Sequence, residues 1–419
     1  MLKQSPRASP LETYEVIKKM WQKIKSQFQK EICPYCFEYF YLKDTPFRCS
    51  SPPSICTPVA DKIYQSAWAD SRPLGKVLEP TGKFKDRFKQ SRRCGSCGHQ
   101  SHKRLCPHCH SDLPHTTGQF KNYIFAVVGA KQAGKSHYIA VLINQIKKQI
   151  GPNMDMLLEP MNDDTIKRYR EDFYNPVYDE KKIIDTTQSA TIDRGVQQPL
   201  VYSVTFSKKG LFGGDRLKNA FILVFFDTAG EDLNNEDVMS TVNKYIYRSD
   251  GILLLMDPLQ ILRVRDQVPN GTALPEKNTE TIDILNRTTR LIQKGRELKI
   301  TDNLSIPLAI AFSKFDAVLP LIDSQFQLHA SANHEKGFDI DDFEAVNSEM
   351  MSLLDQWDGQ EIIHLAKKKY TKYGFFGLSA LGCNPEDTKK IPNVIPHRVE
   401  DPFLWLLAQN AMIKKVQHK

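Results

Sequence analysis

The chain contains 419 residues, of which 41% are hydrophobic and 25% charged, values typical of a globular protein with a substantial core. At about 150 residues per domain, this length predicts two or three structural units. No apolar run approaches the roughly 18 residues that a membrane-spanning helix needs, and the first residues, MLKQSPRASP, lack the apolar segment of a secretory signal. These features argue against a membrane-spanning or secreted protein, and we expect a soluble, cytoplasmic one.

The net charge of +8 is unevenly distributed along the chain. Residues 1–115 contain 20 basic and 10 acidic side chains, whereas the remaining residues contain 37 basic and 39 acidic ones. Eight of the nine cysteines also lie in this first part, and only Cys383 lies outside it. Clustered cysteines in a chain without an export signal favour metal ligands over disulfides. We therefore predict a separate amino-terminal module, divided into residues 1–30 and 31–115.

The first predicted element is a basic amphipathic helix over residues 9–30. Apolar residues recur there every three or four positions along one stripe, and lysines occupy much of the remaining surface. The stripe either packs on the body of the protein or binds a membrane surface or a partner. Packing on the body is the more common arrangement.

Residues 31–115 have little periodic pattern and are rich in proline, serine, cysteine and histidine, so metal ions are expected to stabilise them. Two cysteine pairs suit one closed tetrahedral zinc site, in the order Cys94-x2-Cys97-x8-Cys106-x2-Cys109. A weaker set suggests a second site, in the order Cys33-x2-Cys36-x12-Cys49-x6-Cys56. The ligand pairs can also be exchanged between the two sets. Because neither set suggests an open coordination position, we expect two structural Zn²⁺ ions in a double zinc-ribbon module.

A basic run with two phenylalanines spans residues 83–93. Such a run can stack bases on its rings while its cations contact phosphates. It can equally be a solvated face with two core phenylalanines. We regard nucleic-acid binding as the minority hypothesis and docking of a protein partner as the main one.

Alternating strand and helix patterns begin after Thr117 and predict an α/β domain over 116–419 with a mostly parallel sheet. We predict strands over 122–128, 201–206, 219–226, 250–256, 305–312 and 373–379. We predict helices over 135–150, 235–247, 278–296, 341–368 (continuous or broken at Gly359) and 402–414. The stretches 151–200 and 382–401 show no clear pattern and are predicted to be long loops; residues 160–198 should be mobile without nucleotide.

Residues 129–136, GAKQAGKS, match the complete phosphate-binding motif G-x-x-x-x-G-K-[ST] between an apolar strand and a helix. The glycines allow backbone amides to face phosphate oxygens, and the helix N-terminus adds a partial positive charge. Lys135 is expected to bridge the β- and γ-phosphates and Ser136 to bind Mg²⁺. The predicted nucleotide contacts in this segment are Gly129, Gln132, Ala133, Gly134, Lys135, Ser136 and His137.

Two further motifs concern the γ-phosphate and Mg²⁺. Asp227 follows the apolar strand FILVFF and can hold Mg²⁺ through water, while the Gly230 amide can contact a γ-phosphate. A threonine hydroxyl should complete the Mg²⁺ shell from the loop before the strand at 201–206. The candidates are Thr186, Thr187 and Thr191, with the last two favoured.

Two motifs suit recognition of a guanine base. Asp316 of Ser313-Lys-Phe-Asp can accept hydrogen bonds from guanine N1–H and the exocyclic amine, while the Lys314 stem covers the base. Adenine lacks this donor pair, so Asp316 discriminates between the two bases. A backbone amide of Ser379-Ala380-Leu381 can contact the guanine carbonyl. Each motif is weak alone, but all of them occur in the required chain order.

This set of motifs resembles the translation-factor-related (TRAFAC) class of P-loop GTPases over roughly residues 120–415. The resemblance implies a Ras-like doubly wound sheet, GTP, Mg²⁺ and a switch cycle. Two positions depart from the class: the base motif begins with Ser313 where asparagine or threonine is usual, and Glu231 stands where many members have a glutamine that orients the attacking water. A carboxylate there is repelled by the γ-phosphate, so we expect slow intrinsic hydrolysis or a catalytic group from elsewhere.

The chain is also similar to a narrower group, the double-GTPase-type domains of bacterial conflict (defence) systems. The similarity lies in the cysteine knuckles before the P-loop, the sequence DTAGED, the pair Asp257-Pro258 and the sequence DPFLWLL. It implies a second GTPase or an effector as partner. The main hypothesis is thus a GTP-binding and GTP-hydrolysing switch protein that docks a partner through its zinc module. The alternatives are a nucleotide-dependent assembly scaffold with negligible turnover and an RNA- or ribosome-associated GTPase.

Overall fold

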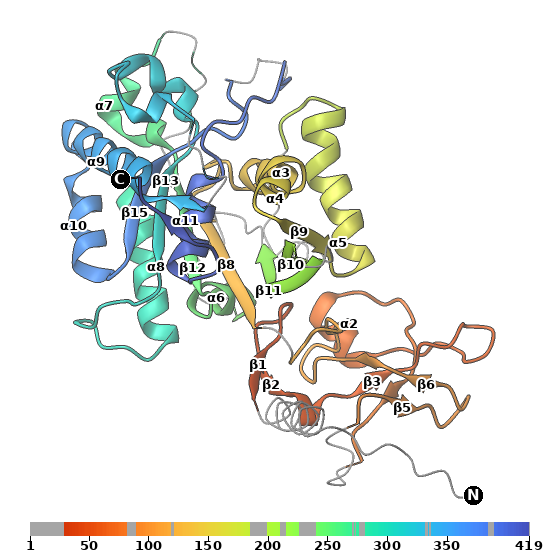
Figure 1. The fold of residues 1–419 in the computed structure, drawn as a ribbon. Coiled ribbons are helices and arrows are strands. Elements are labelled where there is room, and N and C mark those ends of the chain that lie inside the picture. Colours follow the sequence, from red (N-terminus) through yellow and green to blue (C-terminus); the bar gives the residue numbers. More distant parts are fainter. Residues whose placement is uncertain are drawn as a thin grey trace, which may run out of the picture. The chain divides into compact units, whose positions relative to one another are not determined.

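The structure is a computed structural model and consists of two compact units, Met1–Asn122 and Tyr123–Lys419 (Figure 1). The described residues are 29–81, 89–118, 121–184, 199–209, 215–225, 240–269, 272, 274–275, 281–331, 334, 337–383 and 389–418. Residues 9–28 of the predicted helix and most of the basic run at 83–93 therefore lie outside them, while Lys30, the predicted last residue of that helix, belongs to a strand instead. Within the described residues, every helix is too short or too polar to cross a membrane.

The described part of the first unit consists of short strands, one α-helix and one 3-10 turn, in keeping with the weak periodicity of its sequence. Its described elements are β1 (Lys30–Ile32), β2 (Tyr39–Tyr41), η1 (Leu42–Asp44), β3 (Phe47–Arg48), α2 (Lys62–Trp68), β4 (Val77–Leu78), β5 (Arg92–Arg93), β6 (Gln100–Ser101) and β7 (Lys103–Arg104). These strands form small antiparallel sheets: β1 with β2, β3 between β4 and β7, and β5 with β6. Buried cysteines and a few aromatic side chains fill the interior between them.

The second unit is an α/β domain around a seven-stranded sheet. Its strands are β8 (Asn122–Gly129), β9 (Met156–Pro160), β10 (Leu200–Lys209), β11 (Asp215–Phe225), β12 (Gly251–Met256), β13 (Leu308–Phe312) and β15 (Tyr373–Gly377). Their order across the sheet is β15-β13-β12-β8-β11-β10-β9. The pairs β8–β12, β12–β13 and β13–β15 are parallel, whereas β9, β10 and β11 pair antiparallel. The mostly parallel sheet predicted from the sequence is confirmed.

Helices surround this sheet. The principal ones are α3 (Lys135–Gln145), α5 (Asp163–Arg168), α6 (Ser240–Tyr247), α8 (Thr281–Gly295), α9 (Ile340–Gln356), α10 (Gln360–Lys369) and α11 (Asp401–Gln409). Alternate strand residues such as Phe125, Val127 and Leu253 share one core with α3 and α11, while α6, α8 and α10 pack side by side. All six residues of β12 are buried, so both faces of the sheet are covered.

The strand order determines where a ligand is expected to bind. The chain leaves β8, builds β9, β10 and β11 on one side, and then crosses to β12 on the other side. The order therefore reverses at β8. In open α/β sheets, ligands bind at the carboxyl ends of the strands beside such a reversal point. In this unit that point is Gly129, where the phosphate-binding motif begins.

One prediction about this unit is wrong: much of the stretch 151–200 is ordered secondary structure. Residues 156–160 form the edge strand β9, and α5 continues into a π-helix, η4 (Tyr169–Asp179), which contains Pro176. Tyr169, Phe173 and Val177 are buried against the core. Their spacing of four residues places these three side chains on one face of the helix. The expectation of a mobile loop over 160–198 is accordingly corrected for 163–179.

One of the two alternatives for the segment 341–368 is confirmed, and the end of the last helix differs from the prediction. The segment 341–368 is broken at Trp357–Gly359, as the second alternative predicted. The last helix ends at Gln409 rather than at 414, and β16 (Lys415–Val416) follows and pairs with β14 (Phe338–Asp339). Ala411, with a φ of 57°, adopts the left-handed conformation that ends helices.

Candidate nucleotide site and cysteine clusters

The phosphate-binding motif has the backbone geometry that its glycines predict. A Cβ atom at Gly129 would lie 2.5 Å from the Leu255 carbonyl oxygen, so only glycine fits there. Gly134 has a φ of 82° and caps α3. Lys135 is buried, and its Nζ donates to the carbonyl oxygens of Gly129 and Ala130 at 3.0 and 2.9 Å. The ammonium group therefore lies at the start of the loop, and Ser136 follows in the first turn of the helix.

The two base-recognition motifs lie together at the carboxyl ends of adjacent parallel strands. Asp316 follows β13 and Ser379 follows β15. Ser379 Oγ donates to Asp316 Oδ1, and the Gly382 N–H donates to Ser379 Oγ at 2.9 Å. The Phe315 N–H donates to the Leu378 carbonyl at 3.0 Å and closes the pair of loops. Residues far apart in the sequence thus form one polar site, although sequence spacing alone says nothing about their contact.

Lys314 is held by a residue that the prediction of site residues missed. Its Nζ lies 2.5 Å from Oδ2 of Asp257, which is buried at the carboxyl end of β12. The other Asp257 oxygen accepts the Leu259 N–H at 2.9 Å. Lys314 has a φ of 51°, an unusual conformation for a lysine that orients its side chain toward β12. The signal in the sequence was an acid directly after a wholly apolar strand, in the pair Asp257-Pro258.

His137 is the residue after Ser136 and makes a specific contact. The Ile184 N–H donates to His137 Nε2 at 2.9 Å. Burial and, secondly, the positive charge of Lys314 lower the pKa of His137 to about 4. The ring is therefore neutral at physiological pH, and Nε2 is available as a hydrogen-bond acceptor.

The residues predicted to contact Mg²⁺ and the γ-phosphate from the other loops lie outside the described part of the chain. These are Asp227, Gly230, Thr186, Thr187 and Thr191, and Glu231 also lies outside that part.

The eight amino-terminal cysteines form two groups of four in the first unit. The outer cluster contains Cys33, Cys36, Cys106 and Cys109, and the inner cluster contains Cys49, Cys56, Cys94 and Cys97. Within each cluster the four sulfur atoms lie within 4.8 Å of one another. The ligand pairs are therefore exchanged relative to the consecutive sets that spacing favours, and that grouping is wrong. Along the chain, all four cysteines of the inner cluster lie between Cys36 and Cys106 of the outer cluster.

The sulfur geometry fits a tetrahedral zinc ion. Four thiolates at about 2.3 Å from Zn²⁺ have sulfur atoms about 3.8 Å apart. The observed separations are 3.9 Å for Cys33–Cys109, 3.7 Å for Cys36–Cys106, 3.7 Å for Cys49–Cys97 and 4.0 Å for Cys56–Cys94. Disulfide bonds, at about 2.05 Å, are excluded for these pairs.

Three cysteine pairs share one local turn that directs both sulfurs to the same point. The residue after each second cysteine has a positive φ: 59° at Phe37, 74° at Gly98 and 54° at His110. Its N–H donates to the carbonyl of the first cysteine at 3.0, 2.9 and 3.0 Å, respectively. Two non-glycine residues thus adopt a conformation that costs energy, which suggests that ligand geometry determines the turn.

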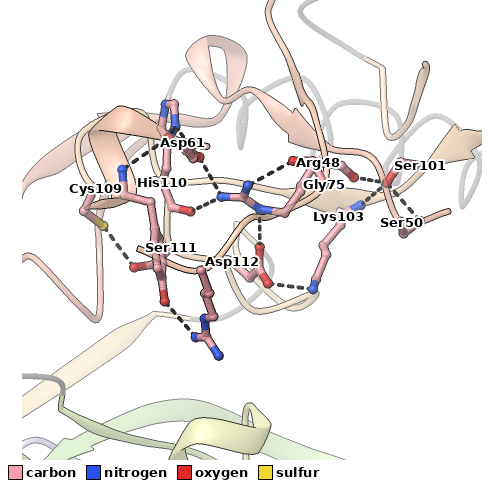
Figure 2. Close-up of polar contacts among 12 residues, drawn as sticks. Arg48, Ser50, Asp61, Gly75, Ser101, Lys103, Cys109, His110, Ser111 and Asp112 are labelled. Carbon is pink, nitrogen blue, oxygen red and sulfur yellow. Dashed lines mark hydrogen bonds and ion pairs between the residues drawn. The ribbon is translucent and has the colours of Figure 1, made fainter. Parts of the chain in front are cut away.

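A buried ionic network lies between the two clusters (Figure 2). Arg48, which precedes Cys49 of the inner cluster, donates to Asp61 Oδ2 at 3.0 Å and to the carbonyl of His110 at 2.8 Å. His110 follows Cys109 of the outer cluster, and its Nδ1 lies 2.9 Å from Asp61 Oδ1. The Arg48 Nε also contacts Asp112 at 3.3 Å. One guanidinium group therefore connects the chain segments of both clusters.

Asp61 is ionised in this network. Burial by itself would raise the pKa of its carboxyl, but hydrogen bonds from the Tyr64 N–H, His110 and Arg48 outweigh it, and the pKa is lowered. Asp61 also caps the helix α2 through that Tyr64 N–H at 3.2 Å. The carboxylate thus combines helix capping with compensation of a buried positive charge.

Replacing Arg48 with methionine is expected to destabilise the first unit by about 3–5 kcal/mol, because the substitution leaves the Asp61 carboxylate buried without its cation. The measurement is thermal or urea unfolding of the full chain, followed by a probe of the first unit such as Trp68 fluorescence. Lys103→Met is the control, since Lys103 pairs with Asp112 at 2.6 Å but is half exposed, and its loss should cost about 1 kcal/mol or less. Equal effects of the two substitutions would contradict the role given to Arg48.

Comparison with known proteins yields one relative and several distant structures. No family model matches the sequence. The chain is 26% identical over 325 residues to "Putative ESX-1 scaffolding and assembly protein SaeC" of Mycolicibacterium smegmatis, covering 72% of this chain and 78% of that protein. At 12% identity and a TM-score of 0.27, it is similar to a nucleolar GTP-binding protein 1 of Plasmodium falciparum, covering 71% of this chain and 89% of that one.

A second solved structure has the same level of similarity. The signal recognition particle receptor SRb-GTP/SRX complex of Chaetomium thermophilum matches at 12% identity with a TM-score of 0.27, covering 63% of this chain and 94% of that one. TM-scores of this size do not define a fold. The assignment of an α/β fold therefore rests on the strand order of the sheet and on the positions of the motifs along it.

Proposed function

We propose that the second unit binds GTP with Mg²⁺ and acts as a nucleotide-dependent switch. The observation that carries the proposal is the position of three motifs at the carboxyl ends of strands of one parallel sheet. The phosphate-binding loop follows β8, Asp316 follows β13 and Ser379 follows β15, with Asp316 and Ser379 hydrogen-bonded to each other. A nucleotide placed along this edge would have its phosphates at α3 and its base at Asp316.

The proposed roles follow from the chemistry of each group. Lys135 and the backbone amides of 129–136 neutralise the β- and γ-phosphates, and the Ser136 hydroxyl binds Mg²⁺. Asp227, Gly230 and either Thr187 or Thr191 complete the Mg²⁺ and γ-phosphate contacts. The Asp316 carboxylate accepts both guanine donors, and Asp257 orients Lys314 beside the base.

Replacing Asp316 with asparagine tests the guanine assignment. An amide has one acceptor oxygen and cannot accept from both N1–H and the amine, so GTP binding should weaken by about 2–4 kcal/mol. Xanthine has a carbonyl in place of the amine, so affinity for xanthosine triphosphate should rise in the same variant. Calorimetric titration with each of the two nucleotides measures both changes in affinity. Asp323→Asn changes an exposed acid in the following loop and serves as the matched control. GTP affinity that survives Asp316→Asn unchanged would refute the assignment.

A second candidate function is a nucleotide-dependent assembly scaffold with negligible turnover. The similarity to a protein named for scaffolding and assembly supports it, as does Glu231 at the position where a water-orienting glutamine is common. In this proposal the zinc module docks a protein partner and the nucleotide unit reports whether GTP is bound. The association with bacterial conflict systems and the RNA-associated role stay predictions without further support.

A single-turnover hydrolysis assay distinguishes the proposed switch function from the proposed scaffold function. The full chain, in excess over radiolabelled GTP, is mixed with that GTP and Mg²⁺, and phosphate release is followed over hours. Hydrolysis over the hours of the assay, or faster hydrolysis on addition of a co-purified partner, favours the switch. GTP that stays intact while bound favours the scaffold.

A further inference from the structure

Main-chain hydrogen bonds join two loops beside the candidate nucleotide site. The nucleotide-binding motifs do not by themselves require these bonds. Residues 181–184 and 389–391 form a short antiparallel bridge in which Lys182 is opposite Lys390. The bonds are Ile183 N–H to Lys389 O at 3.0 Å and Ile391 N–H to Lys181 O at 2.8 Å. The side chain of Ile391 is buried, which fixes this strand of the bridge against the body of the unit.

A third bond connects the bridge to the phosphate-binding helix. The residue after the bridge, Ile184, donates its N–H to Nε2 of His137, directly after Ser136. The neutral state of His137, favoured by its lowered pKa, keeps Nε2 available as the acceptor. One main-chain segment is thus bonded both to the loop after β15 and to the phosphate-binding helix.

The bridge is also connected to the base-recognition motif. The Ser379 N–H donates to the His397 carbonyl and the His397 N–H returns a bond to the Ser379 carbonyl, both at 2.9 Å. The Ile395 N–H donates to the Leu381 carbonyl, also at 2.9 Å. Residues 389–391 therefore belong to the same hairpin-like loop as Ser379–Leu381. The contacts tie the segment that carries the base motif to the one that carries the phosphate motif.

We propose that these contacts form a clasp, made of Lys181–Ile184, Lys389–Ile391 and His137, that must open before guanine nucleotide can dissociate. The inference rests on the proposed function and adds a mechanism that controls the rate of nucleotide release. In the proposed mechanism the base loop and the phosphate loop move apart as the nucleotide leaves, and each bond of the clasp opposes that movement. A partner that separates residues 181–184 from 389–391 would therefore accelerate exchange.

The charges and the backbone conformation of the four lysines lower the stability of the clasp. Lys182 and Lys390 face each other with like charge, an arrangement that destabilises antiparallel pairs, and the ion pair of Lys182 Nζ with Glu180 Oε2 at 3.4 Å offsets only part of this repulsion. Lys181 and Lys389 have φ values of 52° and 61°, in the left-handed region that is unfavourable for residues with a side chain. All four lysines are exposed, so they contribute charge without adding buried apolar contacts.

Two substitutions with opposite expected effects test the clasp by release of fluorescent mant-GDP from the full chain. His137→Ala removes one acceptor and should accelerate release by about tenfold. His137→Gln, whose Oε1 can replace Nε2, should release mant-GDP more slowly than His137→Ala does. Lys390→Glu should slow release by about threefold, since it replaces repulsion from Lys182 with attraction.

The result for Lys390→Glu distinguishes an effect on the clasp from an effect on the attraction between Lys390 and the phosphates. Loss of a positive charge near phosphates would accelerate release, the opposite of the expected result for Lys390→Glu. The double variant Lys182→Glu/Lys390→Glu restores like charges and should return release to near the unmodified rate. Lys299→Glu makes the same charge change in the loop that leads into β13, at the opposite end of that strand from the site, and serves as the control.

The outcomes distinguish the clasp from the function on which it rests. If the unmodified chain does not bind mant-GDP, both the proposed function and the clasp are overturned. If it binds and the release rates of His137→Ala and Lys390→Glu equal those of their controls, the clasp alone is overturned. Hydrogen exchange at the Ile183, Ile184 and Ile391 amides gives a readout without nucleotide: the clasp predicts protection that His137→Ala lowers at Ile184.

Discussion

Lys135→Ala is expected to weaken GTP binding by at least about 100-fold. The Lys135 ammonium lies at the start of the phosphate-binding loop, 3.0 Å from the Gly129 carbonyl and 2.9 Å from that of Ala130. A triphosphate brings several negative charges to this position, and alanine leaves them without their nearest cation. Calorimetric titration of the full chain with GTP and Mg²⁺ measures the loss.

The matched control is Lys131→Ala. Lys131 lies in the same loop, is exposed, and occupies a position at which the motif accepts any residue. The substitution removes the same charge from the loop and should change GTP affinity by about tenfold or less. Similar losses in the two variants would show that affinity depends on the overall charge of the loop rather than on Lys135.

Serine at a cluster cysteine is expected to unfold the first unit. Metal binding by four thiolates contributes about 10–16 kcal/mol in small zinc domains, which is comparable to the whole stability of an ordinary domain. We expect about two Zn²⁺ per chain, and loss of at least one in Cys94→Ser of the inner cluster and in Cys106→Ser of the outer cluster. Because the Arg48 network connects the two clusters, disorder should extend beyond the altered one. Elemental analysis and hydrogen exchange over 29–118 measure both effects.

Cys383→Ser is the control for the zinc variants, since Cys383 belongs to neither cluster. Its zinc content and hydrogen exchange should equal those of the unmodified chain. GTP affinity should persist in Cys94→Ser and Cys106→Ser, because the two units have separate interiors. Protein purified without chelators that contains no zinc would contradict the metal assignment.

The parallel strands were predictable because each is a continuous apolar run that is buried on both faces, as in β12. The edge strand and the π-helix were not. Only Met156 and Leu158 of β9 face the core, and a proline at 176 normally indicates the end of a helix. The buried residues of η4 are only three, Tyr169, Phe173 and Val177, and polar residues and Pro176 separate them.

The candidate sites show a similar division between local and long-range information. Spacing predicts that Cys94 and Cys97 share one ion, because a knuckle is a local turn. It does not predict that Cys49 and Cys56 join them, because that contact depends on how distant segments pair. The contact of Asp257 with Lys314 likewise depends on β12 and β13 being neighbours, which becomes known only from the sheet.

The most direct test of the guanine-nucleotide assignment is calorimetric titration of the unmodified full chain with GTP and, separately, with ATP, both with Mg²⁺. The arrangement of the phosphate-binding loop, Asp316 and Ser379 predicts one GTP per chain and an affinity for ATP weaker by at least about 100-fold, since adenine offers no donor pair to the Asp316 carboxylate. Equal affinities for the two nucleotides, or no binding of either, would contradict it.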